Sequence, residues 1–262
     1  MIKSVSNGRV KQIVQWQTKA KERRKDGVFL AEGIKMFEEA PEELVQEVYL
    51  SADIEKKLRE KQTTFEKLQR TGYEVVLPEV FAKMSDTQTP QGILTVLKRL
   101  EYDLEELLDK PDSLFVILEN LQDPGNLGTI VRTGEGAGIT GVIMSNQTVD
   151  IYNPKTIRAT MGSVYRVPFL YVDDLREVMR KLREKGVHTY AAHLQGSNYY
   201  DTFSLRESTA FLIGNEGNGL SKELADMAEN YLKIPMEGQV ESLNAAVAAA
   251  LLMYETHRQR SQ

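Results

Sequence analysis

The segment 234–255, IPMEGQVESLNAAVAAALLMYE, constrains the fold more than any other part of the chain. It begins where a predicted strand ends and then enters a helix predicted over Leu243–Tyr254. That helix is apolar on every side, so we expect it to be buried all round. Ser242 is the expected N-cap, because a serine hydroxyl accepts a hydrogen bond from an amide of the first turn. With Glu241 and Asn244 it forms either a helix cap or a functional site.

The composition excludes several classes of protein. The 262 residues suffice for one large domain or two smaller ones. The absence of cysteine excludes disulfides, thiolate metal sites and a cysteine nucleophile, and three histidines are too few and too scattered for a metal centre. The apolar run at 245–254 is too short to span a bilayer, and the first 30 residues do not resemble a signal peptide. We therefore expect a cytoplasmic protein with no membrane segment and no metal.

Charge is distributed unevenly along the chain. The net charge is −5, but residues 1–35 contain nine basic and three acidic residues, and the remainder contains 24 basic and 35 acidic residues. A basic end on an acidic body indicates a polyanion bound at one place, although a solvated lysine-rich helix explains it equally well. The candidate phosphate contacts are Lys19, Lys21, Arg23, Arg24 and Lys25.

The pattern of predicted strands and helices changes near residue 100 and divides the chain there. Residues 1–97 are predicted to form a small α/β domain, and the charged stretch 98–112 is predicted to be a linker. Within 113–262, apolar strands alternate with helices, which implies a parallel sheet covered on both faces. The predicted fold class is α/β, with a parallel-sheet domain following a smaller α/β domain.

Residues 136–141, Gly-Ala-Gly-Ile-Thr-Gly, match the dinucleotide-binding pattern G-x-G-x-x-G. That pattern binds a pyrophosphate only when it follows a strand and opens a helix. Here a predicted helix precedes it and a predicted strand follows it. We therefore interpret it as a helix stop and expect no nicotinamide cofactor.

Two polar loops, 120–132 and 213–221, follow predicted strands and lead into predicted helices. Ligands of parallel sheets bind at such loops, and the three glycines of the second loop would let backbone approach a ligand closely. Arg132 is predicted near the first turn of its helix, where the dipole favours acids, so it indicates an anionic partner. A tight polar turn is the alternative explanation for either loop.

Three segments, 123–132, 213–221 and 234–255, resemble in this order the signature motifs of the SpoU-type RNA ribose 2′-O-methyltransferases, members of the trefoil-knot superfamily. The resemblance covers Ser113 to about Arg258. Residues 1–97 are similar to the RNA substrate-binding domain that many members carry, most clearly at 29–33.

The resemblance implies a knotted C-terminal α/β domain, a homodimer, and S-adenosyl-L-methionine as cofactor. Its cofactor-binding positions fall on Ala192, His193, Leu194, Gly214, Asn215, Glu216, Gly217, Gly219, Ile234, Met236, Ser242, Leu243 and Asn244. Its catalytic positions fall on Asn126, Arg132, Glu216, Ser242 and Asn244.

Methyl transfer from a sulfonium to a ribose hydroxyl needs no metal and no covalent intermediate, so the site must orient the hydroxyl and help it lose a proton. A guanidinium rarely gives up its proton. We therefore expect Arg132 to bind the RNA phosphate and position the hydroxyl. Asn126 and Ser242 would hold Arg132, Asn244 would line the reacting centre, and Glu216 would fix the loops.

The extra N-terminal domain favours 23S ribosomal RNA as the substrate, with transfer RNA as the alternative. Two other hypotheses remain: an RNA-binding protein of this fold that acts by occupancy, and a methyltransferase acting on a base. Intact Asn126, Arg132 and 242–244 argue against both.

Overall fold

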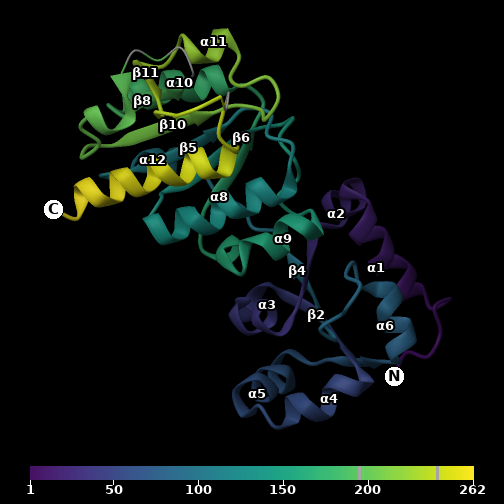
Figure 1. Ribbon diagram of the computed structural model, residues 1–262. Coiled ribbons are helices and arrows are strands. Elements are labelled where there is room, and N and C mark those ends of the chain that lie inside the picture. The colour runs from purple at the N-terminus through teal and green to yellow at the C-terminus, as the bar shows by residue number, and fades with distance from the viewer. Residues whose placement is uncertain (194–195, 197, 240–241) are drawn as a thin grey trace. The chain divides into compact units, whose positions relative to one another are not determined.

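The computed structural model describes residues 1–193, 196, 198–239 and 242–262 (Figure 1). The chain forms two compact units. Unit 1 comprises Met1–Leu100 and Asp150–Tyr165, and unit 2 comprises Glu101–Val149 and Arg166–Gln262. The chain therefore passes from one unit to the other three times, and 16 residues that were predicted to belong to the second domain lie in unit 1.

Unit 1 is built on a four-stranded mixed sheet of order β1-β4-β2-β3, in which β4 is antiparallel to β1 and β2. Its strands are β1 (Val28–Glu32), β2 (Val45–Ser51), β3 (Glu74–Val76) and β4 (Ile93–Lys98). Its helices are α1 (Gly8–Thr18), α2 (Ala20–Asp26), α3 (Ile34–Glu39), α4 (Ala52–Arg59), α5 (Gln62–Thr71), α6 (Pro78–Met84) and α9 (Pro154–Thr160).

Both faces of this sheet are buried. Tyr49 packs in a cluster with Trp16 and Phe81, whereas its neighbours Val48 and Leu50 pack in a second cluster. Successive side chains of a strand point to opposite faces, so the two clusters lie on opposite sides of β2. This explains why three consecutive residues of the strand, Val48 to Leu50, are apolar and buried.

The segment 150–165 is an integral part of unit 1. The Tyr152 ring packs on Phe29 with centroids 4.7 Å apart, and its hydroxyl donates to the Leu100 carbonyl at 3.1 Å. The Tyr165 hydroxyl donates to the Met36 carbonyl at 3.0 Å. These contacts are buried or half-buried, so the N-terminal unit is incomplete without this segment.

In the described part of unit 2, seven parallel strands form a sheet of order β7-β6-β5-β10-β8-β11-β9. The strands are β5 (Leu114–Leu118), β6 (Gly141–Ser145), β7 (Phe169–Val172), β8 (His188–Ala192), β9 (Asn198–Tyr199), β10 (Thr209–Ile213) and β11 (Asn230–Lys233). The helices are α7 (Leu104–Leu108), α8 (Pro124–Ala137), α10 (Leu175–Glu184), α11 (Lys222–Ala225) and α12 (Ala245–Arg260). The predicted parallel α/β class is confirmed.

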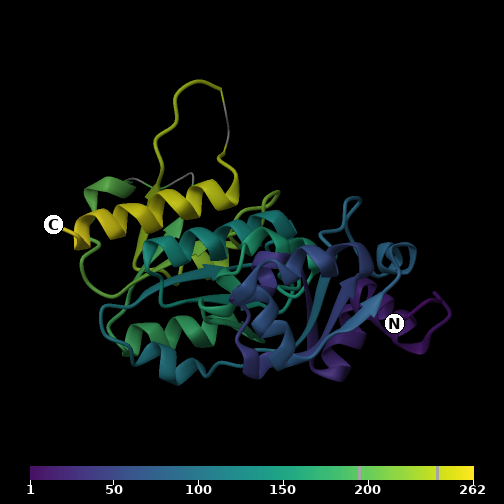
Figure 2. The same cartoon turned by 90° about the horizontal axis from the view of Figure 1, so that it is seen from below.

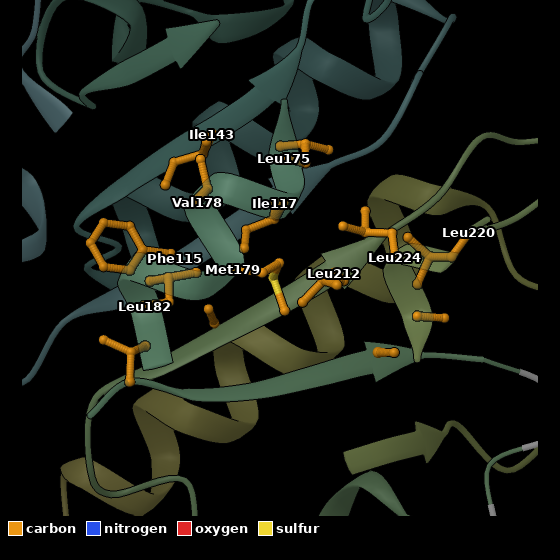
Figure 3. Close-up of a cluster of buried hydrophobic side chains, with 14 of the residues drawn as sticks. Phe115, Ile117, Ile143, Leu175, Val178, Met179, Leu182, Leu212, Leu220 and Leu224 are labelled. Atoms are coloured by element: carbon orange, nitrogen blue, oxygen red, sulfur yellow. The ribbon is translucent and has the colours of Figure 1, made fainter. Parts of the chain in front are cut away.

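Helices cover both faces of this sheet. Residues of α7, α10 and α11 share one core cluster with Phe115, Ile117 and Leu212 (Figure 3). Helices α8 and α12 lie side by side on the opposite face, α12 in yellow and α8 in teal (Figures 1 and 2). Because Leu107 and Leu108 of α7 are buried in the core, the predicted linker 98–112 is in part a structural element of unit 2.

The predictions for the C-terminal helix are corrected in two respects. Its N-cap is Asn244 and not Ser242, because the Asn244 Oδ1 accepts hydrogen bonds from Ala246 N and Val247 N. The helix is also not buried all round: Val247, Leu251 and Tyr254 are 48%, 37% and 48% exposed. Their spacing places them on one stripe of the helix.

The pattern at 136–141 is a helix stop, as predicted. Helix α8 ends at Ala137, Gly138 adopts the left-handed conformation with φ +77°, and β6 begins at Gly141. No helix among the described residues is both long and apolar enough to cross a membrane.

Candidate active site

Glu216 joins the loop after β10 to the start of α8. Its carboxylate accepts hydrogen bonds from Gln122 N, Asp123 N and Asn126 Nδ2, each at 3.0 Å. Burial alone raises the pKa of Glu216, but the hydrogen bonds from Gln122, Asn126 and Asp123 outweigh it and hold the pKa below its ordinary value. The side chain is therefore an anionic acceptor at neutral pH and a weak candidate for a general base.

Asn126 and Asn244 continue this chain of hydrogen bonds. The Asn244 Nδ2 donates to the Asn126 Oδ1 at 2.9 Å, while the Asn244 Oδ1 caps α12. The Asn126 amide is thus oriented at both ends, with its NH₂ toward Glu216 and its oxygen toward Asn244. One network joins the three segments that the sequence analysis singled out.

The loop after β10 closes into a tight turn. Asn215 and Gly219 exchange two backbone hydrogen bonds of 3.1 and 2.8 Å, and the Asn215 Oδ1 accepts from Gly217 N at 2.9 Å. A Cβ on Gly214 would lie 2.0 Å from the Gly219 carbonyl carbon and 2.2 Å from Leu220 N. Glycine is therefore required at 214 by the chain's own backbone, whereas the sequence analysis attributed this glycine to close approach by a ligand.

The prediction that Arg132 lies near the first turn of its helix is wrong. Helix α8 begins at Pro124, so Arg132 lies in the third turn and the helix-dipole argument does not apply. The residue is exposed, and in the part of the chain that the structure describes its guanidinium has no hydrogen-bond or ion-pair partner. Asn126 uses its amide on Glu216 and Asn244 and does not hold Arg132 as expected. Ser242 is exposed.

The predicted cofactor positions gather at one edge of the sheet. Strands β10, β8 and β11 are neighbours and parallel, so the loops that begin at Gly214, His193 and Ile234 leave the same edge. The His193 amide donates to the Leu232 carbonyl at 2.9 Å.

Several predicted positions offer partly exposed apolar surface, which suits an adenosyl group; they are Ala192, Ile234, Met236 and Leu243. Leu194 lies outside the described residues. Within the described ranges there is no group of His, Cys, Asp or Glu side chains that could hold a metal ion.

A polar hollow of about 330 Å³ lies beyond the ends of β5, β6 and β7. Its acidic residues are engaged: Glu119 accepts from Ser221, and Arg176 pairs with both Asp174 and Glu223. Because these charges are already paired within the chain, the hollow offers no obvious set of groups for a ligand, and no site is assigned to it.

Gln122 and Asn120, which were not predicted as site residues, connect the loops after β5, β6 and β10. Both residues lie within four positions of the end of the buried strand β5, which was an available signal. Their partners in other segments are the Ser145 hydroxyl, the Gln147 carbonyl and the Asn215 side-chain amide, and such pairings cannot be read from residue types alone.

The basic residues of α2, with Lys19 immediately before it, divide into two kinds. Lys19, Lys21, Arg24 and Lys25 are exposed, as a phosphate-binding role requires. Arg23 is 3% exposed, and its guanidinium bonds the Trp16 and Gln17 carbonyls and the Asp150 carboxylate. Arg23 is therefore a structural residue, and its prediction as an RNA contact is wrong.

Comparisons with known proteins agree with this arrangement. Residues 113–254 match the model of the SpoU rRNA Methylase family, and residues 7–95 match an MRM3-like substrate binding domain. Over 256 residues the chain is 36% identical to the 23S rRNA (guanosine(2553)-2′-O)-methyltransferase RlmP of Bacillus subtilis, covering 97% of each sequence.

Two solved structures with bound AdoMet are similar over nearly their whole length. An rRNA methyltransferase from Sinorhizobium meliloti has a TM-score of 0.86 at 30% identity, covering 98% of this chain and 97% of that one. The SpoU methyltransferase AviRb from Streptomyces viridochromogenes has a TM-score of 0.86 at 26% identity, covering 98% and 99%.

The fold and site define an RNA methyltransferase of the α/β trefoil-knot class, which confirms the predicted fold class and enzyme class. The chain belongs to the SpoU rRNA methylase family. It is accordingly an RNA 2′-O-methyltransferase, with S-adenosyl-L-methionine as its cofactor.

Proposed function

We propose that this protein methylates the ribose 2′-hydroxyl of one nucleotide in 23S ribosomal RNA. The observation that carries the proposal is the hydrogen-bonded chain Glu216–Asn126–Asn244, which assembles the three motif segments in a protein similar to RlmP over 97% of its length. A cytoplasmic location belongs to the same proposal.

Arg132 serves the RNA in this proposal. Its exposed guanidinium has no partner among the described residues and is therefore available to a phosphate, which it can bind through two parallel hydrogen bonds. Because the guanidinium keeps its proton, the ribose proton passes to the RNA phosphate or to solvent. Asn244 and Ser242 line the reacting centre, and Asn126 positions Asn244.

The cofactor occupies the edge at which β8, β10 and β11 end. The described members of this site are Ala192, His193, Gly214, Asn215, Glu216, Gly217, Gly219, Ile234, Met236, Ser242, Leu243 and Asn244. Bound S-adenosyl-L-methionine supplies an activated methyl group. The protein's own residues therefore need only hold the ribose 2′-hydroxyl in the correct orientation toward that methyl group.

Unit 1 supplies RNA affinity. Its match to a substrate-binding domain over residues 7–95 supports this, as do the exposed Lys19, Lys21, Arg24 and Lys25 of α2 and its preceding residue. These side chains contact phosphates, which position an RNA without reading its sequence.

A second copy of the chain covers the exposed stripe of α12. Val247, Leu251 and Tyr254 line an apolar groove of about 480 Å³ together with Thr129 of α8. The helices already approach closely, since a Cβ on Gly136 would lie 2.8 Å from the Tyr254 Oη. Exposed large apolar side chains grouped in this way are typical of an interface, and the resemblance favours a homodimer. Leu251→Glu should therefore shift the sedimentation of the protein to that of a monomer.

The test of the reaction uses fragments of 23S ribosomal RNA, labelled S-adenosyl-L-methionine and mass spectrometry of the product. The methylated linkage should resist alkaline cleavage, because the attacking hydroxyl is capped. A fragment with a single 2′-deoxy sugar at the target should bind and accept no methyl group. Methylation of the deoxy fragment would place the methyl on a base and overturn the proposal.

Arg132→Ala tests the role of the arginine, with Arg180→Ala as a matched exposed control on α10. We expect turnover to fall by about 100-fold or more in the first variant alone, with cofactor affinity unchanged in both. Loss of cofactor binding in Arg132→Ala would contradict the assignment.

A further inference from the structure

Gln122 makes three hydrogen bonds, each to a different part of the site. Its backbone amide donates to the Glu216 Oε2 at 3.0 Å. Its side-chain Nε2 donates to the Asn120 carbonyl at 2.9 Å and to the Gln147 carbonyl at 2.8 Å. An amide NH₂ has two hydrogens, so both are used on backbone acceptors.

The residue that Gln122 holds is itself in an unusual conformation. Asn120 has φ +56°, in the left-handed region that costs energy for a residue other than glycine. Its amide donates to the Ser145 Oγ at 2.9 Å, and its carbonyl also accepts from the Asn215 Nδ2 at 2.8 Å. The turn after β5 is thus fixed by the loops that follow β6 and β10.

Gln147 belongs to the segment of unit 2 from which the chain enters unit 1. Three residues further on, Asp150 enters unit 1 and pairs with the buried Arg23 at 2.6 Å. Arg23 is followed in α2 by the exposed Arg24 and Lys25, which are proposed to contact RNA. The side chain of Gln122 is therefore a direct connection between the turn that carries Asn126 and the segment that continues into the RNA-binding unit.

We propose that Gln122 is a positioning residue for methyl transfer. By tying the 119–126 turn to the 145–149 loop, it keeps Asn126 and Glu216 in register while unit 1 holds the RNA. It acts through these residues and does not itself touch the cofactor or the ribose. This inference rests on the proposed function, because it takes Asn126 and Asn244 as part of the reacting centre.

The test compares Gln122→Met with Gln147→Ala. Methionine is similar in length but has no hydrogen-bond donor, whereas alanine at 147 removes an exposed side chain and keeps the backbone carbonyl that Gln122 uses. In single-turnover assays with saturating RNA and cofactor, Gln122→Met should transfer methyl about 10- to 100-fold more slowly. The dissociation constants for RNA and S-adenosyl-L-methionine should stay within about threefold, and Gln147→Ala should match the wild type.

A pH profile of Gln122→Glu separates positioning from general damage to the fold. A glutamate there faces two carbonyl oxygens, which raises its pKa, and only its protonated form can donate a hydrogen bond. Its activity relative to wild type should therefore rise as the pH falls from about 8 to about 5.5, while the ratio for Gln122→Met stays constant.

Failure of the proposed function and failure of the inference on Gln122 give different results. A wild-type protein that leaves 23S ribosomal RNA unmethylated would overturn the proposed function and this inference with it. An active wild type and an equally active Gln122→Met would overturn the role of Gln122 alone. The role of Gln122 would also be overturned if the cofactor affinity and melting temperature of Gln122→Met fell along with its rate, since that result is typical of a purely structural residue.

Discussion

The guanidinium of Arg23 lies 2.6 Å from the carboxylate of Asp150, although 127 positions of the chain separate them. Both belong to unit 1, and their side chains are 4% and 24% exposed. The same guanidinium donates to the Trp16 and Gln17 carbonyls. This ion pair fixes the start of the 150–165 segment to helix α2.

Removal of the carboxylate should destabilise the protein markedly. Asp150→Ala leaves the Arg23 charge buried without its counter-ion, which costs about 3 kcal/mol of unfolding free energy. The matched control is Asp86→Ala, which breaks the more exposed Asp86–Arg158 pair and should cost less than about 1 kcal/mol. Urea unfolding measures both, and equal losses would show that the Arg23–Asp150 pair has no special importance.

The 150–165 segment should be needed for unit 1 to fold. Without it, Phe29 loses its contact with Tyr152, and the Met36 carbonyl loses the Tyr165 hydroxyl. We expect a fragment of residues 1–100 to be unfolded or aggregated by circular dichroism. A fusion of residues 1–100 to 150–165 through a short glycine-serine linker should fold cooperatively, since the Leu100 amide already lies 2.8 Å from the Tyr152 hydroxyl. Cooperative folding of the shorter fragment would contradict this prediction.

Sequence periodicity predicted most strands and helices of both units, because their apolar residues recur with the spacing of the element. It failed where a helix breaks without a glycine or proline. The pattern of residues 9–25 predicts a single helix, but the structure interrupts it at Lys19, which is extended with φ −126° and ψ 107°. The pattern of residues 52–71 also predicts one helix, and the structure interrupts it between Arg59 and Gln62. Tertiary packing sets these breaks, and local propensity does not reveal them.

The site was predictable in its residues and less so in its contacts. The motif pattern gave Asn126, Glu216 and Asn244, which the structure brings together in one network. It did not give the amide orientations, which depend on residues about 90 to 120 positions away in the chain. The burial of Arg23 was hidden for the same reason, because a charge count does not distinguish a buried arginine from its exposed neighbours.

Gly214→Ala should disrupt the turn after β10. The added Cβ would lie 2.0 Å from the Gly219 backbone, which is closer than any real contact, so the 214–219 turn must open. We expect S-adenosyl-L-methionine affinity to fall by about 100-fold, because the backbone that forms the proposed site is displaced. At Gly217 in the same proposed site, by contrast, a Cβ meets only the Asn215 Oδ1 at 3.4 Å, so Gly217→Ala should keep the turn and bind within a few-fold of wild type. Calorimetry measures both affinities, and equal loss in the two variants would show that the backbone clash at Gly214 is not the cause of the lost affinity.

His188 should make stability depend on pH. Its ring nitrogens each lie 2.9 Å from a carboxylate oxygen, one of Glu229 and one of Glu207. The hydrogen bonds to Glu229 and Glu207 raise the pKa of His188 above its ordinary value, although burial opposes them. The stabilisation is therefore fully present below the unfolded-state pKa of about 6.5 and is lost as pH rises through the folded-state value.

The variant His188→Gln isolates this effect. Its loss of unfolding free energy relative to wild type should be larger at about pH 6 than at about pH 9. His257→Gln is the control, since His257 contacts the Tyr254 ring and no carboxylate within the described ranges. If the loss of unfolding free energy in His188→Gln were the same at both pH values, protonation of His188 would be excluded as a source of pH-dependent stability.

The salt dependence of RNA binding should identify the phosphate contacts. Lys21, Arg24 and Lys25 are exposed on α2, and their replacement by alanine removes three positive charges from the proposed RNA surface. Each lost phosphate contact lowers the slope of log affinity against log salt by about 0.7 to 0.9, so the triple variant should lose about 2 to 3 in slope.

The matched control replaces three exposed lysines elsewhere in unit 1, Lys56, Lys57 and Lys61, and changes the net charge by the same amount. If binding depended only on net charge, the two triple variants would weaken equally. We expect the control to keep nearly the wild-type slope, because non-contacting charges beyond a Debye length of about 8 Å are largely screened. An unchanged slope in the α2 variant would mean that these residues form a solvated helix face and that RNA binds elsewhere on the protein.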